Sequence, residues 1–110
     1  MDDDRAEHVV VLTTTDDPKE AAALARGLVE ARLAACVQAV PIAATYRWQG
    51  EVETAAEHLL LVKTRADHLD AVKAFLAEHH SYDTPECVAL PVAGGLPAYL
   101  AWLDESVGPA

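Results

Sequence analysis

The chain has 110 residues, with 8 lysines and arginines against 18 aspartates and glutamates, which gives a formal net charge of −10. Hydrophobic residues make up 52% of the sequence, which is enough for one folded domain and excludes a disordered chain. Because nucleic-acid affinity is built from lysine and arginine on phosphates, the charge argues against nucleic acid and anionic membranes as partners. Cations are the partners that this charge favours.

The sequence predicts a protein of the cytoplasm. No apolar run approaches the ~20 residues that a membrane span needs. The acidic start, residues 1–4, is the opposite of the basic start of a secretory signal. Without export, Cys36 and Cys87 are expected to remain reduced thiols. Residues 1–7, which are acidic and lack an apolar period, are expected to form a disordered tail before one domain at residues 8–110.

A strand and a helix are predicted first. Residues 8–15 contain a continuous, mostly β-branched apolar run, which is typical of a strand covered on both faces. Asp17 and Pro18 then supply an acidic N-cap and a proline at the first helical position. Small and apolar residues recur every three or four positions from there to Arg32, which predicts an amphipathic helix that ends near that residue.

A long hairpin is predicted next. Residues 36–48 favour extended structure, with Pro41 as a point of interruption. Gln49 and Gly50 form a two-residue turn, after which the second arm continues through residue 63. Arms of about a dozen residues exceed the ~5–6 of a typical strand, so the hairpin should overhang its own sheet. Because exposed edge strands pair with another copy of the chain unless something covers them, we expect oligomerisation.

The remaining elements complete the fold. A second helix is predicted between residues 64 and 80, a fourth strand over Glu86–Val92, and a third helix from Pro97 to a stop at Gly108. Two strand-helix-strand units joined by a hairpin give one four-stranded antiparallel sheet with both main helices on one face. The predicted fold class is therefore α+β: a ferredoxin-like βαββαβ sandwich with a long hairpin and an extra C-terminal helix. That helix is expected to cover the far face of the sheet or to reach a neighbouring subunit.

Six segments carry a family resemblance. They are Val9–Thr14, Leu33–Val37, Tyr46–Gly50, Leu61–Thr64, His80–Glu86 and Ala89–Val92. In this order and at about this spacing, they resemble the CutA family of divalent cation tolerance proteins, over roughly residues 9–107. The resemblance implies a ferredoxin-like protomer assembled as a homotrimer, similar in architecture to the PII signalling proteins. It also implies a cytoplasmic, non-enzymatic role in tolerance to copper and other divalent cations, with no obligatory cofactor.

The chain departs from the family pattern at three positions. Ser81 stands where the family usually has a proline, so the loop is expected to be more mobile here. Thr13 and Phe75 stand where some members carry cysteines. These two replacements argue against a copper site rich in thiolates.

Four residues form the predicted metal set: Cys36, His80, Tyr82 and Glu86. Cys36 matches the family's cysteine, and a thiolate suits copper or zinc. The alternative is a small buried strand residue, because free cysteine is among the most buried residue types. Adjacent histidines diverge on a helix, so of His79 and His80 one faces a site. His80 is the choice because Tyr82 and Glu86 follow it in the family loop.

A second hypothesis is a PII-like regulatory or assembly module. There, Lys63, Trp48 and Glu86 would bind a small anion or a partner segment in a cleft between subunits. The plainer alternatives are a solvated lysine at a strand end and, for Trp48 with Tyr46, anchors of the subunit interface. An enzyme is the third hypothesis, and it has the least support because the sequence holds neither a catalytic serine motif nor a phosphate-binding loop.

Overall fold

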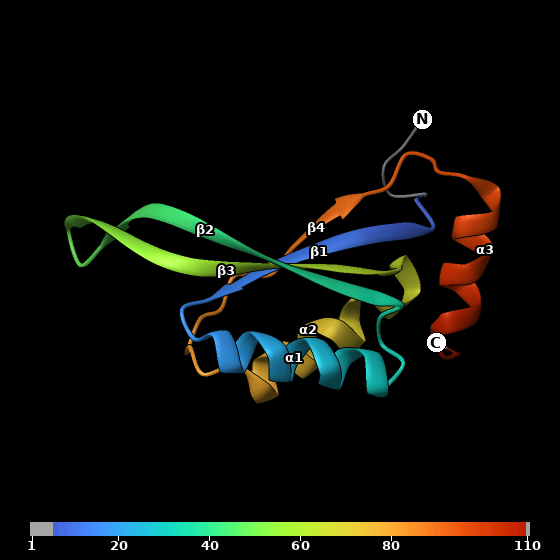
Figure 1. The fold of residues 1–110 in the computed structure, drawn as a ribbon, viewed down its shortest axis with the longest axis horizontal. Coiled ribbons are helices and arrows are strands. Elements are labelled where there is room, and N and C mark those ends of the chain that lie inside the picture. The colour runs from blue at the N-terminus through green and yellow to red at the C-terminus, as the bar shows by residue number, and fades with distance from the viewer. Residues whose placement is uncertain (1–5, 110) are drawn as a thin grey trace.

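The computed structural model describes residues 6–109 and shows one sheet with two helices packed along one face (Figure 1). The strands lie in the order β2-β3-β1-β4, and all neighbouring pairs are antiparallel. The elements are β1 (His8–Thr15), α1 (Pro18–Glu30), β2 (Cys36–Trp48), β3 (Glu51–Arg65), the 3-10 turn η2 (Ala66–His68), α2 (Leu69–His79), β4 (Val88–Pro91) and α3 (Pro97–Ser106). This arrangement confirms the predicted α+β class and the element order.

The expected acidic tail lies mostly outside the described residues. Within them, the Glu7 carbonyl accepts a hydrogen bond from the Ala66 amide at 2.8 Å. The core forms between α1, α2 and the sheet face that they cover. It contains alternate residues of β1 and β3 together with one stripe from each helix: Val9, Val11, Leu24, Leu28, Leu60, Val62, Val72 and Leu76.

Helix α1 begins where the sequence predicts. The Asp17 carboxylate accepts a hydrogen bond from the Lys19 amide at 2.9 Å, and Pro18 occupies the first helical position. The helix ends at Glu30, two residues before the predicted end. Arg32 has a left-handed backbone with φ of 58°, which the helix cannot continue through. The start of this helix is therefore fixed beside the end of β1.

The hairpin is as long as expected and continuous. Strands β2 and β3 have 13 and 15 residues, and they pair from the sheet out to the turn. Gln49 and Gly50 have φ of 49° and 83°, as a tight two-residue hairpin turn requires. The predicted interruption at Pro41 is wrong, because Pro41 pairs with His58. It is accommodated because β2 is an edge strand, where a missing N–H can point away from the sheet.

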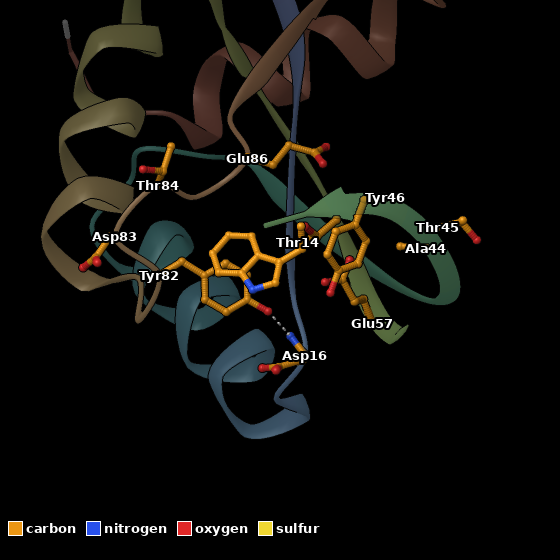
Figure 2. Close-up of a pocket in the computed structure, with 11 residues that line it drawn as sticks. Thr14, Asp16, Ala44, Thr45, Tyr46, Glu57, Tyr82, Asp83, Thr84 and Glu86 are labelled. Carbon is orange, nitrogen blue, oxygen red and sulfur yellow. Dashed lines mark hydrogen bonds between the residues drawn. The ribbon is translucent and has the colours of Figure 1, made fainter. Parts of the chain in front are cut away.

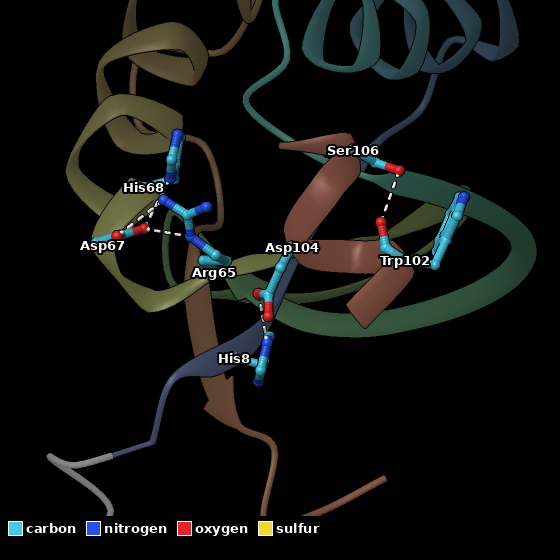
Figure 3. Close-up of polar contacts among 7 residues, drawn as sticks. All are labelled: His8, Arg65, Asp67, His68, Trp102, Asp104 and Ser106. Atoms are coloured by element: carbon cyan, nitrogen blue, oxygen red, sulfur yellow. Dashed lines mark hydrogen bonds and ion pairs between the residues drawn. The ribbon is translucent and has the colours of Figure 1, made fainter. Parts of the chain in front are cut away.

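The last two elements differ in part from the prediction. Strand β4 has four residues instead of seven, although the Val92 amide still donates to the His8 carbonyl at 3.0 Å. Helix α3 lies at the end of the sheet where β1 begins (Figure 1). There the His8 Nε2 lies 2.8 Å from the Asp104 carboxylate (Figure 3), and Leu103 packs with Ala35 and Val107.

The face of the sheet turned away from α1 and α2 is apolar, and we call it the open face. Residues directly opposite each other in an antiparallel pair point to the same side, so the register assigns Val10, Lys63 and Cys36 to this face. Helix α3 borders it at that end. Its apolar residues are half-buried or exposed: Val10, Leu12, Val40, Leu59, Leu61, Val88 and Leu90.

Candidate functional site

A cleft of about 820 Å³ lies between the overhanging hairpin and the loop that joins α2 to β4 (Figure 2). The end of β1 contributes Thr14 and Asp16, and the hairpin contributes Tyr46, Trp48 and Glu57. The loop contributes a third wall, which contains Tyr82, Asp83, Thr84 and Glu86. The cleft therefore joins segments that lie up to about 70 residues apart in the sequence.

Four carboxylates give the cleft its charge. They belong to Asp16, Glu57, Asp83 and Glu86, and the described residues that line the cleft include no lysine or arginine. A concave surface of one charge raises the local concentration of ions of opposite sign. The cleft is therefore suited to cations and repels anions.

Tyr82 forms part of the cleft wall, and its hydroxyl group is hydrogen-bonded. Its oxygen accepts a hydrogen bond from the Asp16 amide at 3.1 Å, as Figure 2 shows. Burial raises the pKa of Tyr82, and the charges of Asp16 and Glu57 raise it further. The side chain is therefore a neutral phenol at neutral pH, which is a far weaker metal ligand than a phenolate.

His80 lies behind the cleft wall and is buried, with 7% of its surface exposed. Its Nε2 lies 2.9 Å from the Thr14 carbonyl, and its Nδ1 accepts the Tyr82 amide at 3.1 Å. These partners assign the neutral tautomer with the proton on Nε2. Nε2 thus attaches the start of the loop to β1, and Nδ1 accepts a hydrogen bond from within the loop, which leaves neither nitrogen turned to a metal.

Cys36 lies elsewhere on the open face. It pairs with Lys63 near the α3 end, whereas the cleft begins around Thr14, which pairs with Leu59 further along the sheet. The predicted metal set is therefore divided: Tyr82 and Glu86 line the cleft, while His80 and Cys36 do not. Across residues 6–109, the structure shows no group of three or more histidine, cysteine, aspartate and glutamate side chains that could hold a metal ion.

The predicted anion-binding set is divided as well. Trp48 and Glu86 line the cleft, but the Lys63 amine lies 5.7 Å from the centre of the Tyr99 ring of α3. Sequence reasoning missed Asp16, Glu57 and Asp83 as cleft residues. The turn at residues 49–50 sets the hairpin register, and that register places Glu57 on the same face as Tyr46, so one of the three could have been found.

The two cysteines are both free thiols. Burial raises the pKa of Cys87, and the nearby charge of Lys73 offsets this only in part. Cys87 is therefore a protonated thiol that packs against the core.

Fold and cleft together define a ferredoxin-like α+β protein with a cleft suited to cations. The family described as CutA1 divalent ion tolerance protein matches residues 9–106. A divalent-cation tolerance protein CutA of Thermus thermophilus is 48% identical over 100 residues, which cover 90% of this chain and 97% of that protein. This chain belongs to the CutA family, which confirms the resemblance of its six segments.

Plant relatives agree in sequence and in structure. The rice "Protein CutA 1, chloroplastic" is 43% identical over 89% of this chain, and this chain spans 56% of its length. The crystal structure of CutA1 from Oryza sativa superposes with a TM-score of 0.92 at 40% identity, covering 96% of this chain and 97% of the other.

In residues 6–109, no helix combines the length and the apolar character needed to cross a membrane.

Proposed function

We propose that this chain is a divalent-metal tolerance protein that binds cations weakly in the acidic cleft. The observation that carries the proposal is the set of four carboxylates lining one cleft without a lysine or arginine among the described lining residues. Relatives are named divalent-cation tolerance proteins, which supports the same general role. Weak binding is expected because the carboxylates line a wide cleft instead of converging on one point, so a hydrated ion is held mainly by charge.

Copper is the preferred ion in this proposal. For a site of given oxygen or nitrogen ligands, Cu²⁺ has the highest affinity among the divalent first-row metals. We propose that the fold needs no metal, because a hydrophobic core between the helices and the sheet supplies its stability. We propose a binding protein and not an enzyme, since the cleft offers charge and aromatic walls but His80, its neighbouring base, has both ring nitrogens engaged.

We also propose that the chain assembles as a homotrimer. Val40, Val88 and Leu90 are 44–49% exposed on the open face, and Trp48 on the overhanging hairpin is 60% exposed. An apolar sheet face of this kind, with edge strands beside it, needs a cover, and further copies of the chain supply one. Light scattering should therefore give three times 11.8 kDa, which is 35.4 kDa. A monomer at micromolar concentration would contradict the trimer.

Calorimetric titration tests the cation site. Cu²⁺, Zn²⁺ and Mg²⁺ are added separately to the full chain at fixed ionic strength, since screening weakens charge-based binding. We expect saturable binding with dissociation constants on the order of 0.1–1 mM and Cu²⁺ the tightest. If none of the three ions saturates below about 1 mM, a concentration at which binding is worth roughly 4 kcal/mol, the proposal fails.

The charge of the cleft weighs against the PII-like alternative with a small anionic ligand. Trp48 and Glu86 of that set are in the cleft, but their surroundings are negative and Lys63 is near α3.

The two free thiols are consistent with a reducing compartment such as the cytoplasm, which we propose as the location.

A further inference from the structure

The loop that forms one wall of the cleft has no regular secondary structure of its own. Residues 81–87 follow the C-terminal cap of α2 and contribute Tyr82, Asp83 and Glu86 to the cleft wall. The position of these three side chains therefore depends on what attaches the loop to the rest of the molecule. Three consecutive residues, 80–82, make those attachments.

Glu20 makes the attachment at the middle of these three residues. Its carboxylate accepts the Ser81 amide at 2.8 Å on one oxygen and the Ser81 hydroxyl at 2.9 Å on the other. The Thr15 hydroxyl donates to the second oxygen as well, at 2.5 Å. Glu20 thus connects the first turn of α1, the end of β1 and the loop, although it does not itself line the cleft.

An ionised carboxylate is the group that these partners require. All three contacts are donors, and a carboxylate anion accepts at both oxygens. Burial alone would raise the pKa of Glu20, yet the hydrogen bonds from Thr15 and Ser81 outweigh burial and lower the pKa below its usual value. A glutamine would turn an N–H toward one of the donors. A proline at position 81 would lack the amide donor altogether.

We propose that Glu20 is a positioning residue for the cation cleft: by holding Ser81, it fixes the loop whose carboxylates bind the ion. The inference rests on the proposed cation site for its functional consequence. It also bears on the expectation that Ser81 loosens the loop, because the amide and hydroxyl of Ser81 supply a restraint of their own through Glu20.

The test compares Glu20→Gln with Glu30→Gln. Both remove one negative charge from α1, but Glu30 is exposed at the far end of the helix, paired with Arg26 at 3.1 Å. Amide hydrogen exchange at Ser81 and Tyr82 reports the loop, exchange in β1 and β3 reports global opening, and a Cu²⁺ titration reports the cleft. Ser81→Ala, which removes one donor and leaves the amide in place, is the milder variant should Glu20→Gln fold poorly.

We expect Ser81 exchange to accelerate about tenfold in Glu20→Gln, as for the loss of one charge-assisted hydrogen bond, with β1 and β3 unchanged. Cu²⁺ affinity should fall about three- to tenfold relative to Glu30→Gln, and less in Ser81→Ala. In the wild-type chain, the Ser81 amide resonance should also shift as Glu20 ionises, and this titration should vanish in Glu20→Gln. A loop that is merely well packed would not show that signature.

Two results would overturn the inference. Equal Ser81 exchange in Glu20→Gln and Glu30→Gln would show that Glu20 does not hold the loop. Faster exchange with unchanged Cu²⁺ affinity would show that the loop's position does not set binding. If the wild-type chain binds no cation, the proposed function and the affinity claim fail together, while Ser81 exchange still decides whether Glu20 holds the loop.

Discussion

The two ends of the open face differ in how their charged groups are paired. At the α3 end, His8 pairs with Asp104, and Lys63 lies against the ring of Tyr99 (Figure 3 shows the His8 pair). At the other end, four carboxylates line a cleft without a lysine or arginine among the described lining residues. At the α3 end, the charged side chains are engaged in contacts that attach the helix to the sheet. At the cleft end, the carboxylates remain accessible to solvent and to ions.

This difference shows which part of the net charge of −10 bears on a cation site. The acidic excess of the whole chain attracts cations in general, but attraction alone does not locate a site. Asp104 and Asp67 carry the same charge as the cleft carboxylates, yet each has a partner: the His8 Nε2 lies 2.8 Å from Asp104, and the Arg65 guanidinium pairs with Asp67 at 3.0 Å. What marks the cleft is the absence of such partners along its described lining, together with concavity.

The largest expected effect is a loss of folding stability that is confined to the α3 end. Leu103 is buried with Ala35 and Val107 in a small cluster separate from the main core. Leu103→Ala should lower the free energy of unfolding by about 2–3 kcal/mol, the lower part of the range for buried leucines. Urea denaturation measures this loss. Cu²⁺ affinity should stay at its wild-type value, and an equal loss of affinity would show that the two ends are not independent.

The second-largest expected effect is a loss of Cu²⁺ affinity that is confined to the cleft end. Glu57→Gln combined with Glu86→Gln removes two of the four carboxylates and keeps the side-chain volumes. Cu²⁺ affinity should fall about tenfold, because each removed charge within several ångströms of the ion is worth on the order of 1 kcal/mol or less at a surface site. The unfolding free energy should stay constant or rise, because removing two negative charges reduces the repulsion among the four carboxylates of the cleft. Asp104→Asn, at the α3 end, is the control that should leave Cu²⁺ affinity unchanged.

Local patterns predicted much of the fold. Asp17 and Pro18 located the start of α1, and the Gln49-Gly50 turn located the hairpin and its register. These are short-range features, in which the residues that determine the structure are adjacent in the chain. Strand β4 was overestimated because its length is set by pairing with β1, which involves only Val9 to Leu12, and not by its own local sequence.

The site was less predictable because its contacts span the chain. His80 was chosen as a ligand from its place in the loop, but the Thr14 carbonyl that engages it lies 66 residues away. Glu20 falls inside the helix predicted from Pro18 to Arg32, where its local sequence indicated no role in the site, and its bonds to Ser81 cross 61 residues. Such pairings follow from how α2 and the loop pack against β1, which no local spacing encodes.

The third effect uses pH to compare a carboxylate at each end. Hydrogen bonds lower the pKa of Glu20 despite burial, and the hydrogen bond from Arg65 lowers the pKa of Asp67. A lowered folded-state pKa gives stability that is present above the usual pKa and is lost as the pH falls through the folded value. Between about pH 5 and 3, wild-type stability should therefore fall more steeply than that of Glu20→Gln or Asp67→Asn. Urea denaturation at each pH measures the slopes, and equal slopes in the wild-type chain and in Glu20→Gln would contradict the prediction.

The smallest effect concerns Lys63 and separates the cation cleft from the anion hypothesis. Lys63→Ala removes a cation near an aromatic ring at the sheet surface, an interaction worth about 0.5–1 kcal/mol. The unfolding free energy should fall by no more than that, and Cu²⁺ affinity should not fall, because Lys63 lies outside the cleft. Lys73→Ala, on the exposed side of α2, is the matched control. If a small anion raises the melting temperature of the wild-type chain and Lys63→Ala abolishes that rise, the α3 end holds an anion site and its charges are not fully consumed in holding the helix.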